Sequence, residues 1–124
     1  MAILDSIGIQ LFSLPRALEA DLEGTLQMLA EMGYSEIELY GPYPFSAESN
    51  KIEWNALTPI LGFQGSGFFG TEESDFLALC KDSGFRIPSM HTDLDTLVKH
   101  MPALAKSAQN LGAPLVTLPA IPQE

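Results

Sequence analysis

Two hydrophobic patterns alternate along the chain. Residues 7–14 are apolar and β-branched with little charge, which predicts a strand buried on both faces that ends before Pro15. Residues 21–33 carry leucines at the spacing of an amphipathic helix, with an aspartate as its N-terminal cap and a glycine at its end. Residues 36–40 predict a short strand that a Gly-Pro pair terminates. The first third of the chain therefore predicts strand, helix, strand.

The junction from helix to strand returns twice more. At Gly33, Gly84 and Gly112 a predicted helix ends at a glycine, and a strand begins within about three residues. Gly84 and Gly112 are 28 residues apart, about the length of one strand-helix unit, whereas Gly33 and Gly84 are 51 apart. The second unit therefore carries an insertion, which we place at about 43–70 with one short helix around 47–57.

The remaining pattern completes four strands. A third helix is predicted from Thr71, as its cap, to Cys80, a fourth begins near Pro102, and residues 115–118 read as the last strand. Strands that alternate with helices imply an α/β fold with a parallel sheet. Two architectures remain open at this point: an open doubly wound sheet, and half of a (β/α)₈ barrel, or TIM barrel, of about 250 residues.

Half of a barrel cannot close its own sheet. It leaves two unpaired parallel edges and an uncovered apolar face. We therefore interpret residues 1–124 as a single partial barrel unit, and we expect it to pair with a second copy as a homodimer, to belong to a longer polypeptide, or to aggregate.

Composition narrows the possible partners. The formal net charge is -10, so the chain should repel nucleic-acid phosphates and anionic lipid. No stretch reaches the roughly 20 apolar residues of a membrane helix. Cys80 is the only cysteine, which excludes an intrachain disulfide. We expect a cytoplasmic protein that binds neither nucleic acid nor membrane, with Cys80 packed in the core.

Candidate reactive groups are sought toward the carboxyl ends of the predicted strands, because parallel α/β folds place their sites there. The first strand offers Gln10, the second Glu38 and Tyr40, and the third His91. An imidazole beside carboxylates can bind a metal or transfer a proton, although His91 could instead cap its own strand end. Glu38 lies between Ile37 and Leu39; it is either buried and paired or exposed at a strand end. On neighbouring strands, Glu38 and His91 could form a hydrogen-bonded pair.

Two features of the insertion suggest other roles. Residues 65–70 read Gly-Ser-Gly-Phe-Phe-Gly, which matches G-x-G-x-x-G, but the preceding segment is a poor strand because of Pro59. A dinucleotide site is the weaker interpretation there, and a plain glycine-rich loop or active-site lid the stronger. The aromatic side chains of the insertion could form a wall over a sugar ring or the core of the insertion itself; they are Trp54, Phe63, Phe68 and Phe69.

Four segments together resemble the sugar phosphate isomerase/epimerase family, within the xylose isomerase-like barrel superfamily. They are Ile-Gly-Ile-Gln-Leu-Phe-Ser-Leu, Leu-Ala-Glu-Met-Gly-Tyr-Ser-Glu-Ile-Glu-Leu, Phe-Arg-Ile-Pro-Ser-Met-His-Thr-Asp-Leu and Leu-Gly-Ala-Pro-Leu-Val-Thr-Leu-Pro. The resemblance spans nearly the whole chain apart from the insertion. It implies the N-terminal half of a barrel that isomerises or epimerises sugars or sugar phosphates by proton transfer α to a carbonyl.

The resemblance also implies site residues and a cofactor. Glu38 and His91 match an acidic residue and a histidine at the second and third strand ends of the family, with His91 a metal ligand in one branch. Gln10 and Tyr40 become substrate-side residues. The cofactor implied is a divalent cation, Mn²⁺, Mg²⁺, Co²⁺ or Zn²⁺, whose principal ligands lie in the second half of the barrel. The isolated chain could then be inactive, and a non-catalytic half-barrel that binds or dimerises is the alternative, with a nucleotide-binding domain the weaker third.

Overall fold

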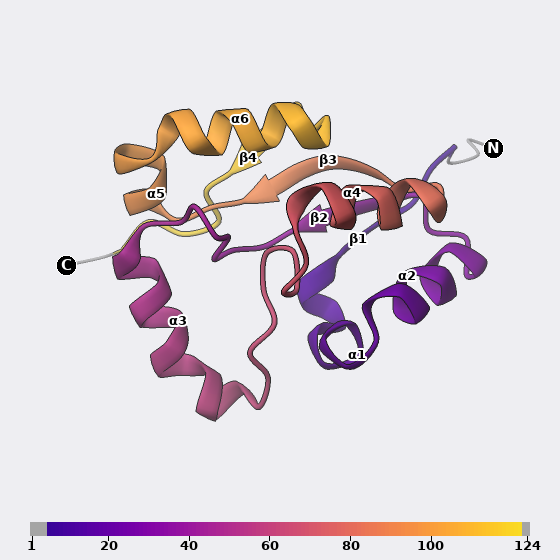
Figure 1. Cartoon of the computed structure of the whole chain (residues 1–124), viewed down its shortest axis with the longest axis horizontal. Coiled ribbons are helices and arrows are strands. Elements are labelled where there is room, and N and C mark those ends of the chain that lie inside the picture. The colour runs from indigo at the N-terminus through magenta and orange to yellow at the C-terminus, as the bar shows by residue number, and fades with distance from the viewer. Residues whose placement is uncertain (1–4, 123–124) are drawn as a thin grey trace.

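A four-stranded parallel sheet forms the centre of the molecule (Figure 1). The structure, a computed structural model, describes residues 5–122. Helical segments separate successive strands, as parallel pairing requires. In chain order the elements are β1 (Gly8–Gln10), the short 3-10 helix η1 (Leu11–Ser13), α1 (Pro15–Ala20), α2 (Leu22–Glu31), β2 (Glu36–Leu39), α3 (Glu48–Leu61), α4 (Glu73–Asp82), β3 (Arg86–His91), α5 (Leu94–Lys99), α6 (Met101–Leu111) and β4 (Leu115–Thr117).

The order of the strands distinguishes the two architectures left open by the sequence. The strands lie side by side in the order β1-β2-β3-β4, and each neighbouring pair is parallel. A doubly wound sheet reverses its order at a switch point, whereas consecutive order is that of a (β/α) barrel. The prediction of about four parallel strands in a partial barrel is therefore confirmed.

The two faces of the sheet differ in polarity. On β2, Ile37 and Leu39 are fully buried, while Glu36 and Glu38 are only half-buried. Because side chains alternate between the faces of a strand, one face of β2 is apolar and the other polar. The apolar face belongs to a core that the helices complete with Leu18, Leu26, Leu29, Phe76, Cys80 and Leu104. Burial raises the pKa of the Cys80 thiol to about 12, and its predicted packing is confirmed.

The first strand is shorter than predicted. It ends at Gln10, not at Leu14, because the Gln10 side-chain oxygen accepts a hydrogen bond from the Phe12 amide at 2.9 Å and turns the chain into η1. Pro15 does more than end a strand, since it is the first residue of α1, which the sequence analysis missed. Proline fits the first turn of a helix, where its missing N–H leaves no bond unmade.

The helix expected around 47–57 is present and longer, since α3 runs on to Leu61 and ends at Gly62 in a left-handed conformation. Only one of its residues, Thr58, is fully buried. In Figure 1 α3 extends away from the other helices, and a long loop returns from its end to α4. That next helix begins after Glu72, and Thr71, predicted as its cap, instead donates a hydrogen bond to the Phe68 carbonyl.

Both outer strands of the sheet have an open edge, since β1 and β4 each pair with a single neighbour within residues 5–122. On β4, Leu115 is 62% exposed and Val116 38% exposed. Adjacent strand residues point to opposite faces, so β4 presents uncovered apolar surface on both. This agrees with the expectation that a partial barrel leaves apolar surface uncovered.

None of the helices that the structure describes has the length and apolar character needed to cross a membrane.

The sheet-helix core gives a matched test of the fold. Ile37→Val on β2 removes one methylene from a fully buried site, so we expect a loss of about 0.5–1.5 kcal/mol in the free energy of unfolding. The same substitution at Ile60 on α3, which is 83% exposed, should cost less than about 0.5 kcal/mol. Urea unfolding followed by circular dichroism measures both. Equal losses at the two positions would contradict the assignment of Ile37 to the core.

Candidate functional site

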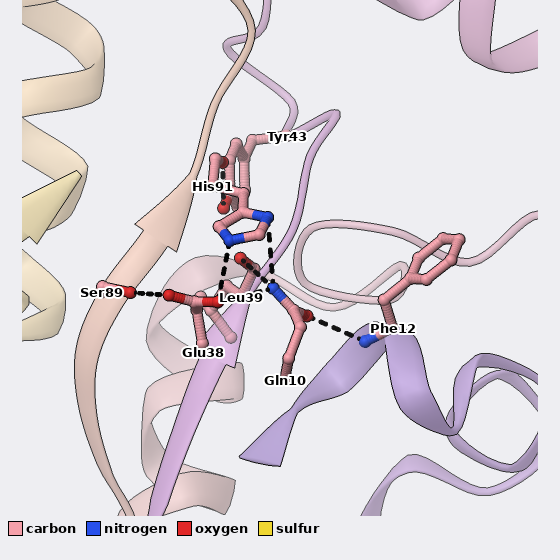
Figure 2. Close-up of polar contacts among 7 residues, drawn as sticks. All are labelled: Gln10, Phe12, Glu38, Leu39, Tyr43, Ser89 and His91. Atoms are coloured by element: carbon pink, nitrogen blue, oxygen red, sulfur yellow. Dashed lines mark hydrogen bonds and ion pairs between the residues drawn. The ribbon is translucent and has the colours of Figure 1, made fainter. Parts of the chain in front are cut away.

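The register of the sheet brings polar side chains from three strands together on one face. Gln10 on β1 lies opposite Glu38 on β2, and Glu38 lies opposite Ser89 on β3. His91 follows Ser89 by two residues, so it shares this face. All four lie at or near the carboxyl ends of their strands. Figure 2 shows their side chains directed at one another.

Glu38 is the centre of the cluster. Its Oε1 atom lies 2.8 Å from His91 Nε2 and accepts a hydrogen bond from Gln10 Nε2 at 3.0 Å, while its Oε2 accepts one from the Ser89 hydroxyl. The Glu38 side chain is 29% exposed and that of His91 is 25% exposed. Of the two interpretations left open, the paired carboxylate is the one found, because three donors compensate its partial removal from water.

The contacts of His91 favour one arrangement of its protons. Its Nδ1 lies 3.4 Å from Gln10 Nε2, and an amide nitrogen can only donate. A neutral imidazole then carries its proton on Nε2 and donates it to Glu38. The Tyr43 hydroxyl donates to the His91 carbonyl at 2.8 Å. Burial, and then the charge of Glu38, raise the pKa of Tyr43, which keeps that hydroxyl a donor.

The cluster borders a cavity of about 490 Å³. Gln10 and His91 form one side of it, and Phe12, Tyr40 and Trp54 supply aromatic surface. The Tyr40 ring packs on those of Phe12 and Trp54, with centroids 5.1 and 6.0 Å apart. Its hydroxyl does not enter the cavity as a free group, because it donates to the Gly65 carbonyl at 2.7 Å. Tyr40, expected on the substrate side, therefore contributes its ring, and not its hydroxyl, to the wall of the cavity.

Sequence reasoning missed several members of the site, among them Ser89 and Phe12. Ser89 binds Glu38, and Phe12 lines the cavity. A signal for Ser89 existed, since it precedes His91 by two residues and must share its strand face. No comparable signal existed for Phe12, because η1 and not a strand positions it.

The glycine-rich loop does not have the context of a dinucleotide site. Residues 65–70 follow the helix α3 and not a strand, so the strand-turn-helix arrangement that this motif requires is absent from them. The loop is instead held against the residue that follows β2, because the Gly67 amide donates to the Tyr40 carbonyl at 3.0 Å. Among the aromatic residues of this region, Trp54 lines the cavity, whereas Phe68 is buried at 3% exposure in the main core of the protein and not in a separate core of the insertion.

The donor set does not fit a divalent cation by itself. Glu38 and His91 are the two metal-type donors that meet, and both imidazole nitrogens already contact Gln10 or Glu38. Asp93 uses its carboxylate to cap α5, accepting from the Thr96 amide at 3.0 Å. Within residues 5–122 no three side chains of His, Cys, Asp or Glu gather as a cation site requires. The structure thus offers at most part of a coordination shell.

Comparison with solved structures agrees with this architecture. Two structures, each described as a sugar phosphate isomerase/epimerase from Parabacteroides distasonis ATCC 8503, superpose with TM-scores of 0.61 and 0.62 at 21% and 22% sequence identity. The alignments cover 99% and 94% of this chain but only 41% and 43% of those chains. No protein-family model matches the sequence, and no curated protein matches it significantly. The chain therefore has the fold of the N-terminal half of these isomerase/epimerase structures and spans about two fifths of their length.

The titration of one carboxylate near the site should be observable in the NMR shifts of the amides that it contacts. Glu19 on α1 accepts hydrogen bonds from the amides of Gln64 and Gly65, and these bonds lower its pKa below the ordinary value of 4.5. A lowered pKa means that the contact stabilises the loop above pH 4.5 and is lost as pH falls through the folded-state pKa. We expect the two amide proton shifts in NMR spectra to titrate below pH 4.5.

Two matched variants separate the titration of Glu19 from other effects of low pH on the protein. Glu19→Gln should abolish the titration of both amides, whereas Glu31→Gln, at an exposed position of α2, should leave it unchanged. Titration that survives in Glu19→Gln would contradict the assigned contact.

Proposed function

We propose that this chain forms part of a sugar or sugar phosphate isomerase/epimerase, acting by proton transfer at a carbon α to a carbonyl. The observation that carries the proposal is the 2.8 Å contact between Glu38 and His91 beside an aromatic-walled cavity, at the carboxyl ends of parallel strands. Barrel enzymes place their reactive groups at this end of the sheet. The two solved structures of the same fold, both described as isomerase/epimerases, support the same class.

The cavity suits a monosaccharide in size and surface. Its volume of about 490 Å³ lies within the usual range for small-ligand sites. The rings of Phe12 and Trp54 can pack against the C–H face of a sugar, while Gln10, Asn50 and Asp93 offer polar groups to its hydroxyls.

The pair provides the groups that proton transfer needs. His91, which lines the cavity, can accept at Nδ1 the proton released when the C–H bond α to the carbonyl breaks, and the electron pair of that bond then forms an enediolate. Glu38, 2.8 Å from Nε2 and behind the ring, stabilises the positive charge that the imidazole gains. The Gln10 amide can donate to the developing oxyanion by giving up its weakest contacts, the 3.4 Å ones to His91 and to the Leu39 carbonyl. His91 can hold the moving proton or return it. Return of the proton to the neighbouring carbon, with a proton passing from the hydroxyl of the original carbon to the former carbonyl oxygen, isomerises the sugar. Return of a proton to the original carbon from the opposite face epimerises it.

A divalent cation, if one takes part, would polarise the carbonyl, and Glu38 and His91 are the two described residues able to ligate it. The remaining ligands would come from a partner or from a further part of the polypeptide.

Hydrogen exchange tests the proposed chemistry without knowledge of the product. The chain is incubated in D₂O with ketoses, aldoses and their phosphates, with and without Mn²⁺, Mg²⁺, Co²⁺ or Zn²⁺, and loss of the α C–H signal is followed by NMR. We expect exchange that falls at least about 100-fold in Glu38→Gln and in His91→Ala.

His100→Ala is the control for His91→Ala, because His100 is exposed at the end of α5, and it should retain full activity. Exchange that is unaffected by Glu38→Gln would contradict the role given to the pair. Folded protein that exchanges no sugar under any of these conditions would favour the second candidate function.

That second candidate is a non-catalytic half-barrel that assembles with another half. The open β4 edge favours it, with Leu115 62% exposed and Val116 38% exposed. A second copy could supply its own β1 edge to this strand, and two such contacts would close both open edges. Assembly is also compatible with catalysis, because a composite barrel would surround the Glu38–His91 pair.

Solution mass measures assembly directly. Size-exclusion chromatography with light scattering should give a homogeneous dimer, and Leu115→Lys should convert it to monomer by placing a charge on the strand edge. Ile60→Lys, at a more exposed position of α3, is the matched control and should remain dimeric. A stable wild-type monomer would contradict self-assembly through β4.

A further inference from the structure

The charged groups around the cavity are acidic. Glu53 and Asp93 line it directly, and Glu38 lies behind Gln10 and His91. Within residues 5–122, the ionisable side chains that line the cavity are the carboxylates of Glu53 and Asp93, the phenol of Tyr40 and the imidazole of His91. Burial raises the pKa of that phenol, so it stays neutral. The potential in the cavity is therefore negative.

The N-terminus of α5, which borders the cavity through Asp93 and Leu94, is already capped by a carboxylate. Asp93, at the cap of α5, accepts a hydrogen bond from the Thr96 amide at 3.0 Å and another from the Thr96 hydroxyl. The Thr96 hydroxyl accepts in turn from the Ala47 amide at 2.9 Å. This network fixes the Asp93 carboxylate where an anionic ligand would otherwise meet helix amides.

The cationic side chains of the chain lie elsewhere. Arg16 donates to the Leu61 carbonyl at 3.0 Å, Lys51 to the Pro44 carbonyl at 2.7 Å, and Lys99 lies 3.6 Å from Asp95. Arg86 pairs with Glu36 at the opposite end of β2 and β3 from His91. None of the six Lys and Arg residues, all of which lie within the described range, lines the cavity.

We propose that the cavity selects a neutral monosaccharide over its phosphate ester. This inference rests on the proposed function and decides between the two substrate classes that it leaves open. A phosphate monoester carries about 1.5–2 negative charges at neutral pH and needs cations or free amides for its oxygens. Carboxylates at Glu38, Glu53 and Asp93 repel such a group, while Glu53 and Asp93, which line the cavity, can accept hydrogen bonds from the hydroxyls of an uncharged sugar.

Matched ligand pairs test the proposal. Three free sugars, D-fructose, D-ribulose and D-xylulose, are titrated against their terminal phosphate esters. Fluorescence of Trp54, the single tryptophan, and amide shifts of the cavity residues in NMR spectra report binding. For the sugar that binds best we expect a dissociation constant at least about tenfold lower than that of its phosphate at physiological salt. The ratio should grow when the salt is lowered, because less screening strengthens the repulsion.

A charge reversal in the cavity gives the decisive comparison. Glu53→Lys should reduce the preference for the free sugar by at least about threefold, or invert it. Glu48→Lys makes the same change in net charge on the same helix at an exposed position that does not line the cavity, and it should leave the preference unchanged.

The outcomes distinguish failure of this inference from failure of the proposed function. Phosphate esters that bind as tightly as the free sugars, or more tightly, would overturn the inference while leaving the proposed function intact. A preference that Glu48→Lys alters as much as Glu53→Lys would also overturn it, because net charge and not the cavity would then be responsible. No response to either member of any pair would contradict the proposed function itself, and the inference with it.

Discussion

The half-buried carboxylate of Glu38 is the constraint on which the polar face of the sheet depends. A carboxylate partly removed from water must be compensated by donors, and here the donors come from both neighbouring strands. Gln10 approaches from β1, while Ser89 and His91 approach from β3. The carboxylate at the centre of the candidate site thereby links three strands, so the geometry of the site and the register of the sheet are parts of one arrangement.

The opposite face of the same strands shows why the site is held firmly. Ile37 and Leu39 alternate with the glutamates of β2 and are fully buried under the helices. A shift of one residue in register would turn these side chains toward the polar face and Glu38 into the core, at a large cost in free energy. The apolar face thus fixes where the Glu38–His91 pair lies. The loops beyond the strand ends then add the aromatic wall and the Asp93 carboxylate around the cavity.

The parts of this arrangement that sequence could predict are local ones. The glycines at the ends of α2, α4 and α6, the leucine spacing of α2 and the short strand predicted at 36–40 are set by neighbouring residues, and they appear where expected, with the strand one residue shorter. Repeated strand-helix units also imply parallel strands, because short crossovers leave few other topologies. Glu38 and His91 could be proposed as partners for the same reason, since both follow strands that are adjacent in the chain.

The remaining features depend on contacts between distant segments. Gln10 lies 81 residues from His91 in the chain, and only the register of the sheet joins them. The early end of β1 follows from a side chain bonding its own backbone at Phe12, which hydrophobic patterning does not detect. The glycine-rich loop is also held by Glu19, which lies on the helix α1 that sequence patterning missed. Each case is a polar contact whose partner lies outside the periodic pattern.

The most direct test of the central claim is which imidazole nitrogen of His91 carries the proton in the neutral ring, read from the two nitrogen shifts by NMR. If Glu38 organises the site, the neutral ring carries its proton on Nε2, next to Glu38, and Nδ1 shows the shift of an acceptor. Glu38→Gln should redistribute the two tautomers, while the exposed His100 serves as an internal reference whose shifts do not change. A His91 proton on Nδ1, or shifts that Glu38→Gln leaves unaltered, would contradict the account.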